Sequence, residues 1–204
     1  MSFDASAFLL YYDDKIGEYP ARNPNNAALD VRYRSNIGTA ATYGLELLGD
    51  WKIDRTFFDV PDFSWNYFVN IALTDSKYLK SQDVLVEGNK VEFVPRFNIK
   101  TGSGVGYRNF RASAQFTYVS DQFTDARNLT SSRSDNTLGI YGQIPSYYVT
   151  DLSFSYKWKR FKFETGINNV TNNRYFTRRA TGYPGPGILP SEPRTFYGTL
   201  EIKI

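Results

Sequence analysis

Histidine and cysteine are both absent from this chain of 204 residues. Without cysteine there is no disulfide framework, no thiolate metal site and no cysteine nucleophile. Without histidine the chain lacks the usual general base at neutral pH, the commonest zinc ligand and any serine–histidine triad. We also find no convincing pair of carboxylates for a site built from acids alone. We therefore expect a protein that is not an enzyme, with no catalytic residues, no metal-ligating residues and no cofactor.

Long apolar runs are missing as well. The longest uninterrupted runs are only a few residues, whereas a membrane-spanning helix needs about 20, so the sequence excludes a helical membrane protein. The net charge is +3, and Lys and Arg are scattered among Asp and Glu without a basic run. This mixed pattern is typical of solvated surfaces, and we predict no nucleic-acid partner. The first residues lack the basic and apolar regions of a signal peptide, so we expect none here.

What the chain does contain is aromatic residues, at 17%, and an alternation of apolar and polar residues with a period of two. In 151–158 the apolar Leu152 and Phe154 fall on one face and the polar Ser153 and Ser155 on the other. This period is the signature of a β-strand with two different faces. The same pattern predicts strands at 3–16, 31–53, 65–78, 95–107, 110–118, 151–158, 161–168 and 195–204. One face of the strand at 95–107 carries glycines that leave room on that side: Gly102, Gly104 and Gly106.

The connections between these strands alternate between long and short. Long polar segments fall at 17–30, 79–94, 121–146 and 169–193, with short turns between them. Outer-membrane barrels have this pattern, with short periplasmic turns and long extracellular loops. We predict an all-β, antiparallel transmembrane β-barrel with about eight strands present and both chain ends on the periplasmic side. Aromatic residues flank the short turns, as an interfacial girdle requires: Trp51, Trp65, Tyr107, Phe110, Trp158 and Phe161.

Several stretches resemble one known family. Gly-Ile-Asn-Asn-Val-Thr-Asn-Asn-Arg-Tyr-Phe at 166–176 is similar to the penultimate strand and following loop of TonB-dependent outer-membrane receptors. Glu-Pro-Arg-Thr-Phe-Tyr at 192–197 resembles the start of their last strand. Looser similarities at 36–38, 43–46 and 94–98 extend the resemblance over nearly the whole chain, in the family's order. Details at 175–178 and 192–195 look nearest to receptors of the ferric dicitrate type.

The resemblance implies a barrel of about 22 strands, closed inside by an N-terminal plug and energised by TonB. We expect residues 1–204 to be the C-terminal part of such a barrel, with the plug domain and signal peptide absent from this chain. TonB would act through the absent N-terminal part, and the location would be the outer membrane of a Gram-negative bacterium, in contact with its lipid. The chain departs from the family at Ile204, because members usually end in Phe or Trp.

The implied function is transport of a ferric chelate, either ferric citrate or a siderophore complex. Many such chelates are anionic, and arginine offers a permanent charge with bidentate donors. Arg178 and Arg179 are our first candidates for ligand binding, with Tyr183 as a stacking or hydrogen-bonding neighbour. Further candidates in or beside the long loops are Arg127, Arg133, Arg174 and Arg194. Each arginine has the alternative of binding lipopolysaccharide phosphates or pairing with loop carboxylates.

A different class of function is also compatible with the strand count. About eight strands can close into a small barrel filled by side chains, which would serve as a membrane anchor or adhesin. The two hypotheses differ in the partners of the final strand, 195–204. Both give it the 161–168 strand on one edge. A self-contained barrel would place the 3–16 strand on the other edge, whereas a receptor would place there a strand from outside this chain.

Overall fold

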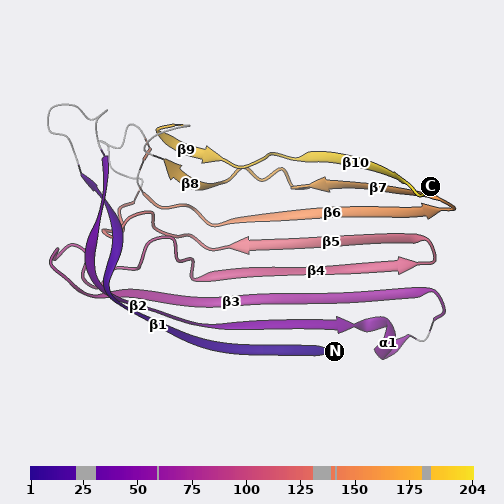
Figure 1. Ribbon diagram of the computed structural model, residues 1–204, viewed down its shortest axis with the longest axis horizontal. Helices are drawn as coiled ribbons and strands as arrows, with labels where there is room; N and C mark the ends of the chain where they lie inside the picture. Colours follow the sequence, from indigo (N-terminus) through magenta and orange to yellow (C-terminus); the bar gives the residue numbers. More distant parts are fainter. Residues whose placement is uncertain (22–30, 59, 131–138, 141, 181–184) are drawn as a thin grey trace.

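A computed structural model of the chain describes residues 1–21, 31–58, 60–130, 139–140, 142–180 and 185–204. Eight strands form one antiparallel sheet in the order β1-β2-β3-β4-β5-β6-β7-β10 (Figure 1). Each strand therefore pairs with the next along the chain, except that β7 pairs with β10. The strands are β1 (Ser2–Ala21), β2 (Val31–Lys52), β3 (Phe63–Ser81), β4 (Phe97–Tyr107), β5 (Phe110–Val119), β6 (Tyr147–Trp158), β7 (Phe161–Asn168) and β10 (Thr195–Ile202).

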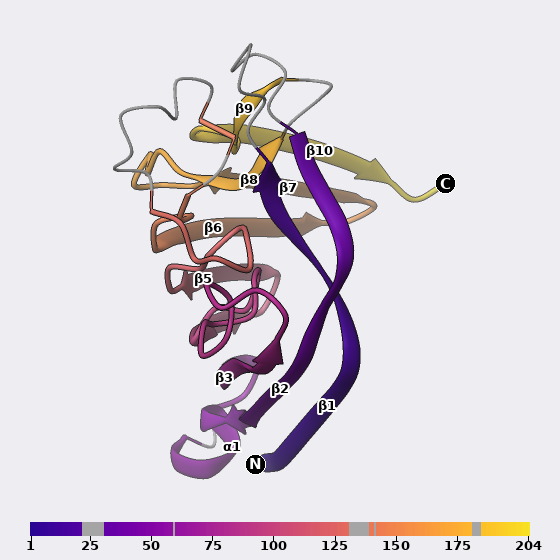
Figure 2. The same ribbon diagram turned by 90° about the vertical axis from the view of Figure 1, so that its left-hand side faces the viewer.

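The sheet is curved but open, so the chain forms a partial barrel (Figure 2). The final strand pairs with β7, from Thr195 opposite Asn168 to Ile202 opposite Phe161, as the sequence predicted. Within the described residues, its other edge and the outer edge of β1 have no strand beside them. The closed eight-stranded barrel that we kept as an alternative is therefore not formed.

The strand register divides the sheet into an apolar and a polar face. Phe154 of β6 lies opposite Ala112 of β5 and Thr165 of β7, whereas its neighbour Ser153 lies opposite a serine and a glycine. The apolar face carries large exposed side chains from most strands, and Phe196 is 71% exposed. Such a surface would drive aggregation in water but suits the lipid-facing wall of a barrel. The predicted division into outward and inward residues is kept across the sheet.

The two ends of the sheet are built differently. Figure 1 places the turns β2–β3, β4–β5 and β6–β7 at one end and the long connections at the other. At the short-turn end a helix of one turn, α1 (Ile53–Phe57), was not predicted. It brings the Phe57 ring to 5.5 Å from that of Trp51, while Trp158 stacks on Phe161 at 6.0 Å. No helix of the described residues is long and apolar enough to span a membrane.

The buried apolar cluster lies at the long-loop end, where the loops at 82–96 and 120–130 fold over the ends of β2 and β3. It consists of Ile37, Ala40, Tyr78, Val86, Val91 and Ala126. The Tyr78 hydroxyl donates a hydrogen bond to Glu92 Oε2 at 2.8 Å, so the loop carboxylate satisfies the polar group that this burial would otherwise leave unpaired. The long loops of this cluster are thus packed structures of their own.

Three predicted loops contain strand. β3 continues to Ser81, into the loop expected at 79–94. β1 continues to Ala21, where we expected a loop from residue 17, and its pairing with β2 extends to Val31. Pro20 lies opposite Arg32 near the end of this pairing. In the segment 169–193 a hairpin is formed by β8 (Phe176–Ala180) and β9 (Gly187–Pro190). The density of Gly and Pro around it hid these short strands from the sequence pattern.

Candidate functional site

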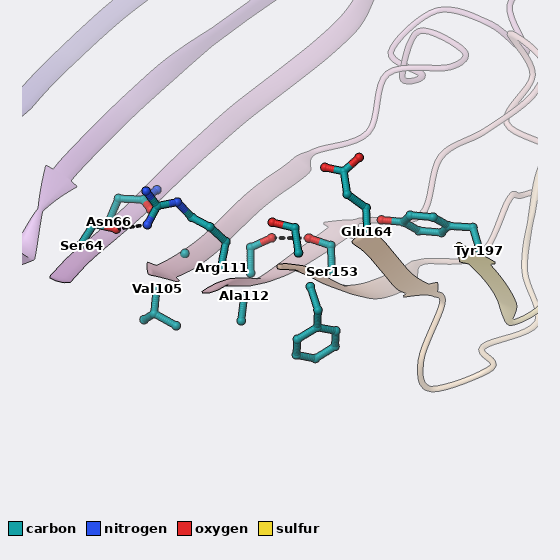
Figure 3. A pocket seen from close by; sticks show the side chains of 12 residues that line it. Ser64, Asn66, Val105, Arg111, Ala112, Ser153, Glu164 and Tyr197 are labelled. Carbon is teal, nitrogen blue, oxygen red and sulfur yellow. Dashed lines mark hydrogen bonds between the residues drawn. The ribbon is translucent and has the colours of Figure 1, made fainter. Parts of the chain in front are cut away.

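A groove of about 530 Å³ crosses the polar face over β3 to β7 and β10. In Figure 3 Arg111 and Glu164 point to this side of the sheet, and Val105 and Ala112 point to the opposite side. We call it the wall groove. Its polar lining consists of Ser64, Asn66, Arg111, Ser113, Ser153, Ser155, Glu164 and Tyr197. These are inward positions of the predicted alternation, so the groove belongs to the lumenal side of the barrel wall.

The wall groove carries charges of both signs. Arg111 Nη1 donates to Ser64 Oγ at 3.0 Å on one side, and Glu164 is paired with Lys162 Nζ at 2.5 Å on the other. Between the two charges, the hydroxyl oxygens of Ser113 and Ser153 lie 2.6 Å apart in a hydrogen bond. The groove can therefore exchange hydrogen bonds with a hydrated polar molecule, and it presents no single sign of charge.

The predicted room beside the glycines of β4 is filled. A Cβ added at Gly102 would lie 2.5 Å from a ring carbon of Phe68, and at Gly104 it would meet an amide side chain of β3. At Gly106 the guanidinium of Arg111 takes the same space. The glycines leave room on this side, as expected, and side chains of the neighbouring strands occupy that room. The glycines thereby allow the polar lining of the groove to lie close to the sheet.

At the long-loop end, Asn169 joins the segments around it. Its backbone N–H donates to Asp151 Oδ1 at 2.8 Å, its Nδ2 donates to the carbonyl oxygens of Asn173 and Glu192, and its Oδ1 accepts the Asn173 N–H. The residue is 3% exposed and has φ of +52°, a conformation that asparagine tolerates better than most residues. Asn169, within the stretch that resembles the receptor family, therefore connects β6, the turn after β7 and the segment before β10.

Arg127 joins two long loops. Its Nε and Nη2 donate to Asp83 Oδ2 at 2.9 and 2.7 Å. The Leu85 backbone N–H, followed by the Arg127 guanidinium, holds the pKa of the Asp83 carboxyl below its ordinary value. This contact matches the alternative stated for the loop arginines, pairing with a loop carboxylate.

Arg178 and Arg179 lie side by side on β8 but differ in surroundings. The Arg179 side chain is buried, with the residue 7% exposed, and donates to the carbonyl oxygens of Gly139 at 2.7 Å and Gln143 at 2.8 Å. Arg178 is exposed to solvent. A pair predicted to act together is thus divided between the interior of the loop cluster and its surface.

Of the remaining candidate ligand-binding residues, two are exposed and two lie outside the described part of the chain. Arg174 and Arg194 are exposed, and the backbone N–H of Arg194 donates to Asn172 Oδ1 at 3.1 Å. Arg133 and Tyr183 lie outside the described residues. Ligand binding by these residues stays a prediction.

Sequence reasoning did not single out Arg111, Glu164 or Asn169. The inward phase of Arg111 and Glu164 was visible in the alternation. Their meeting across a groove depends on the curvature of the sheet, and the connections of Asn169 depend on segments distant in the chain. Only the fold brings these residues to their partners.

An antiparallel sheet with one apolar and one polar face, and with short turns opposite long packed loops, defines the wall of a transmembrane-type β-barrel. The family described as TonB dependent receptor-like, β-barrel matches residues 1–170, and this chain belongs to it. Members of the family are transporters rather than enzymes, so the prediction of a non-enzyme is confirmed at the level of the family. Barrels of this family lie in the outer membrane of Gram-negative bacteria.

Solved structures with the same fold include the unliganded ferric citrate transporter FecA, with a TM-score of 0.74 and 19% identity over 98% of this chain. The copper transporter OprC has a TM-score of 0.68 and 15% identity, and the ferric yersiniabactin receptor FyuA of Yersinia pestis has 0.68 and 20%, each over 98% of this chain. The chain covers 28%, 28% and 27% of these three structures. None of the curated proteins matches. At these identities the likeness establishes the fold.

Proposed function

We propose that this chain is the wall and loop portion of an outer-membrane receptor that imports an anionic ferric chelate with energy supplied through TonB. The observation that carries the proposal is membership of the TonB dependent receptor-like barrel family. The lumenal wall groove and the packed loops at one end supply what a transporter needs, a polar path and a binding mouth. The groove gives a hydrated ligand hydrogen-bonding partners along the wall.

The barrel of the proposed receptor is larger than this sheet. Unpaired N–H and C=O groups cost several kcal/mol each inside a bilayer, so lipid-exposed sheet edges do not occur there. The described residues leave one edge of β1 and one of β10 unpaired. We infer that strands outside this chain complete a barrel of about 22 strands, of which residues 1–204 are the C-terminal part. The plug and the contact with TonB would lie in the rest of the receptor.

An anionic chelate is supported by the cations at the mouth. Arg178, Arg174 and Arg194 are exposed there, and charge-assisted hydrogen bonds from guanidinium groups favour carboxylate-bearing ligands. Structures with the same fold are named for ferric citrate, for ferric yersiniabactin and, in BauA of Acinetobacter baumannii, for ferric preacinetobactin. OprC is named as a copper transporter, so the fold by itself does not select the cargo. Within this group we favour ferric dicitrate, on the resemblance at 175–178 and 192–195.

The test uses the complete protein as the organism makes it, purified in detergent. Binding of ferric dicitrate and of an uncharged ferric trihydroxamate is measured by quenching of tryptophan fluorescence. Uptake of radioactive iron is then followed in cells with and without TonB. We expect tighter binding of the anionic chelate and uptake that requires TonB. Equal affinity for both chelates would contradict the substrate assignment, and TonB-independent uptake would contradict the mechanism.

A further inference from the structure

Arg179 joins two segments that are distant in the chain. It lies on β8, in the connection between β7 and β10, and its guanidinium reaches into the connection between β5 and β6. There Nη1 donates to the Gly139 carbonyl oxygen at 2.7 Å and Nη2 donates to the Gln143 carbonyl oxygen at 2.8 Å. Nε also points to the Gln143 oxygen, at 3.3 Å. One side chain thus holds backbone groups that lie four residues apart.

A β-bulge helps to seat this guanidinium. The pairing of β8 with β9 shifts register between Phe176 and Arg178. In a regular strand, residues three apart point to opposite faces. Here the Arg179 guanidinium lies over the Phe176 ring, 4.9 Å from its centroid, which a shift of one residue allows. The ring covers one face of the guanidinium while the carbonyl oxygens take its edge.

The same arrangement fixes the neighbouring residue. Arg178 is opposite Leu189 and Arg179 is opposite Ile188 in the β8–β9 hairpin, so the two arginine side chains leave the strand in opposite directions. With Arg179 held inside the loop cluster, the hairpin cannot rotate about its own axis without breaking these hydrogen bonds. Arg178 is therefore held toward solvent. A long flexible cation gains most in binding when its backbone is already fixed.

We propose that Arg179 is a positioning residue, which latches the β8–β9 hairpin to the backbone at Gly139 and Gln143 and thereby presents Arg178 to an anionic ligand at the mouth. This inference rests on the proposed function for the ligand, but the latch itself does not. Arginine is required at the latch because its planar fork donates in two fixed directions at once. A lysine ammonium is a point donor on a flexible stem and does not reproduce that geometry.

The experiment is a double-mutant cycle in the complete protein, with binding of ferric dicitrate and of an uncharged ferric trihydroxamate as the first readout. We expect Arg178→Ala to weaken ferric dicitrate binding roughly ten- to hundredfold, the range of a hydrogen bond between charged groups, and to leave the uncharged chelate unchanged. Arg179→Ala should reduce the same charge preference by a similar factor. In the double variant the losses should not multiply, because Arg179 acts through Arg178.

Hydrogen exchange of backbone amides is the second readout, in peptides that cover 142–146 and β8. We expect exchange there to be about tenfold faster in Arg179→Ala and in Arg179→Lys, and unchanged in Arg178→Ala. Arg178→Lys should keep part of the preference for the anionic chelate. Arg55→Ala, at an exposed arginine on α1, is the matched control and should change neither readout.

The outcomes separate the two levels of the proposal. Losses that multiply in the double variant would mean that Arg179 binds the ligand directly, and they would overturn the positioning role. Unchanged exchange in Arg179→Ala would overturn the latch. A protein that binds neither chelate but shows the expected exchange would refute the proposed substrate and leave the latch standing.

Discussion

The inside and outside of the barrel wall are tested by placing one charge at two neighbouring positions. Leu152 and Ser153 are adjacent on β6, and their side chains belong to the apolar and polar faces respectively. Leu152 lies opposite Ala114 and Ile167, whereas Ser153 lines the wall groove. Substituting each residue by arginine introduces the same charged side chain into the same strand, once on each face. The difference between Leu152→Arg and Ser153→Arg therefore reports which face meets lipid.

The expected magnitude follows from the depth of Leu152. The residue lies six positions before Trp158, which is at the short-turn end. At about 3.3 Å per residue and a tilt of about 45°, this is roughly 14 Å above the girdle, near the middle of an apolar band about 25 Å tall. An arginine at that depth costs about 2–4 kcal/mol. The polar groove should accept the Ser153→Arg side chain, so the folding equilibria should differ by roughly 30-fold to several hundredfold.

Urea titration of the complete protein in lipid vesicles measures both variants, with folding followed by tryptophan fluorescence. Leu152→Ala is the control for loss of the leucine side chain without a charge. We expect Leu152→Arg to be less stable than both Leu152→Ala and Ser153→Arg. Equal destabilisation by the two arginines, or a larger loss at Ser153, would refute the assignment of faces.

Three further predictions concern the loops and the glycines. The pKa of Asp83 lies below its ordinary value of 3.8, so its bond with Arg127 should be complete at neutral pH and should weaken only as the pH falls through the lowered pKa. Pepsin cleavage within 82–96 should therefore rise only in that acid range and in the Asp83→Asn variant. Cleavage that already rises near neutral pH would contradict this. Asn169→Ala removes buried hydrogen bonds and should lower local stability by about 1–3 kcal/mol, seen as faster amide exchange around 169–173. Unchanged exchange would show that the hydrogen bonds of Asn169 are not needed to hold this loop. A Cβ at Gly44 would collide with a backbone carbonyl oxygen, whereas the nearest neighbour of a Cβ at Gly198 is 3.9 Å away. In urea titration, Gly44→Ala should therefore destabilise the protein by about 1–3 kcal/mol, and Gly198→Ala by much less. Equal effects of the two substitutions would contradict the packing argument.

The long strands were predictable because their signal is local. Residues two apart share a face whatever the partner strand is, so the faces of β6 and the pairing of Ile202 with the strand that contains Phe161 follow from the sequence pattern. The turns at 108–109 and 159–160 are as short as predicted, with positive φ at Arg108 and Lys159. The family was also accessible from motifs, and the match over residues 1–170 confirms it.

The candidate site was less predictable because its contacts are not local. Arginines were chosen for an anion site because of their side-chain chemistry. In the structure some of the chosen arginines are buried and others are exposed. Arg179 is turned into the loop cluster by a bulge and by carbonyl oxygens about 40 residues away. Arg127 is taken up by a carboxylate 44 residues away. No pattern within either segment distinguishes these residues from the exposed Arg178.

The sequence by itself determined the alternation of faces, the alternation of long and short connections, and the absence of histidine and cysteine, since each of these depends on residue type and spacing alone. The tertiary structure decided that the sheet stays open at β1 and β10, that side chains of neighbouring strands fill the space beside the β4 glycines, and that one of two adjacent arginines is buried. The physical reason is that pairing across strands, curvature and loop packing depend on groups far apart in the chain, which meet only when the sheet has formed.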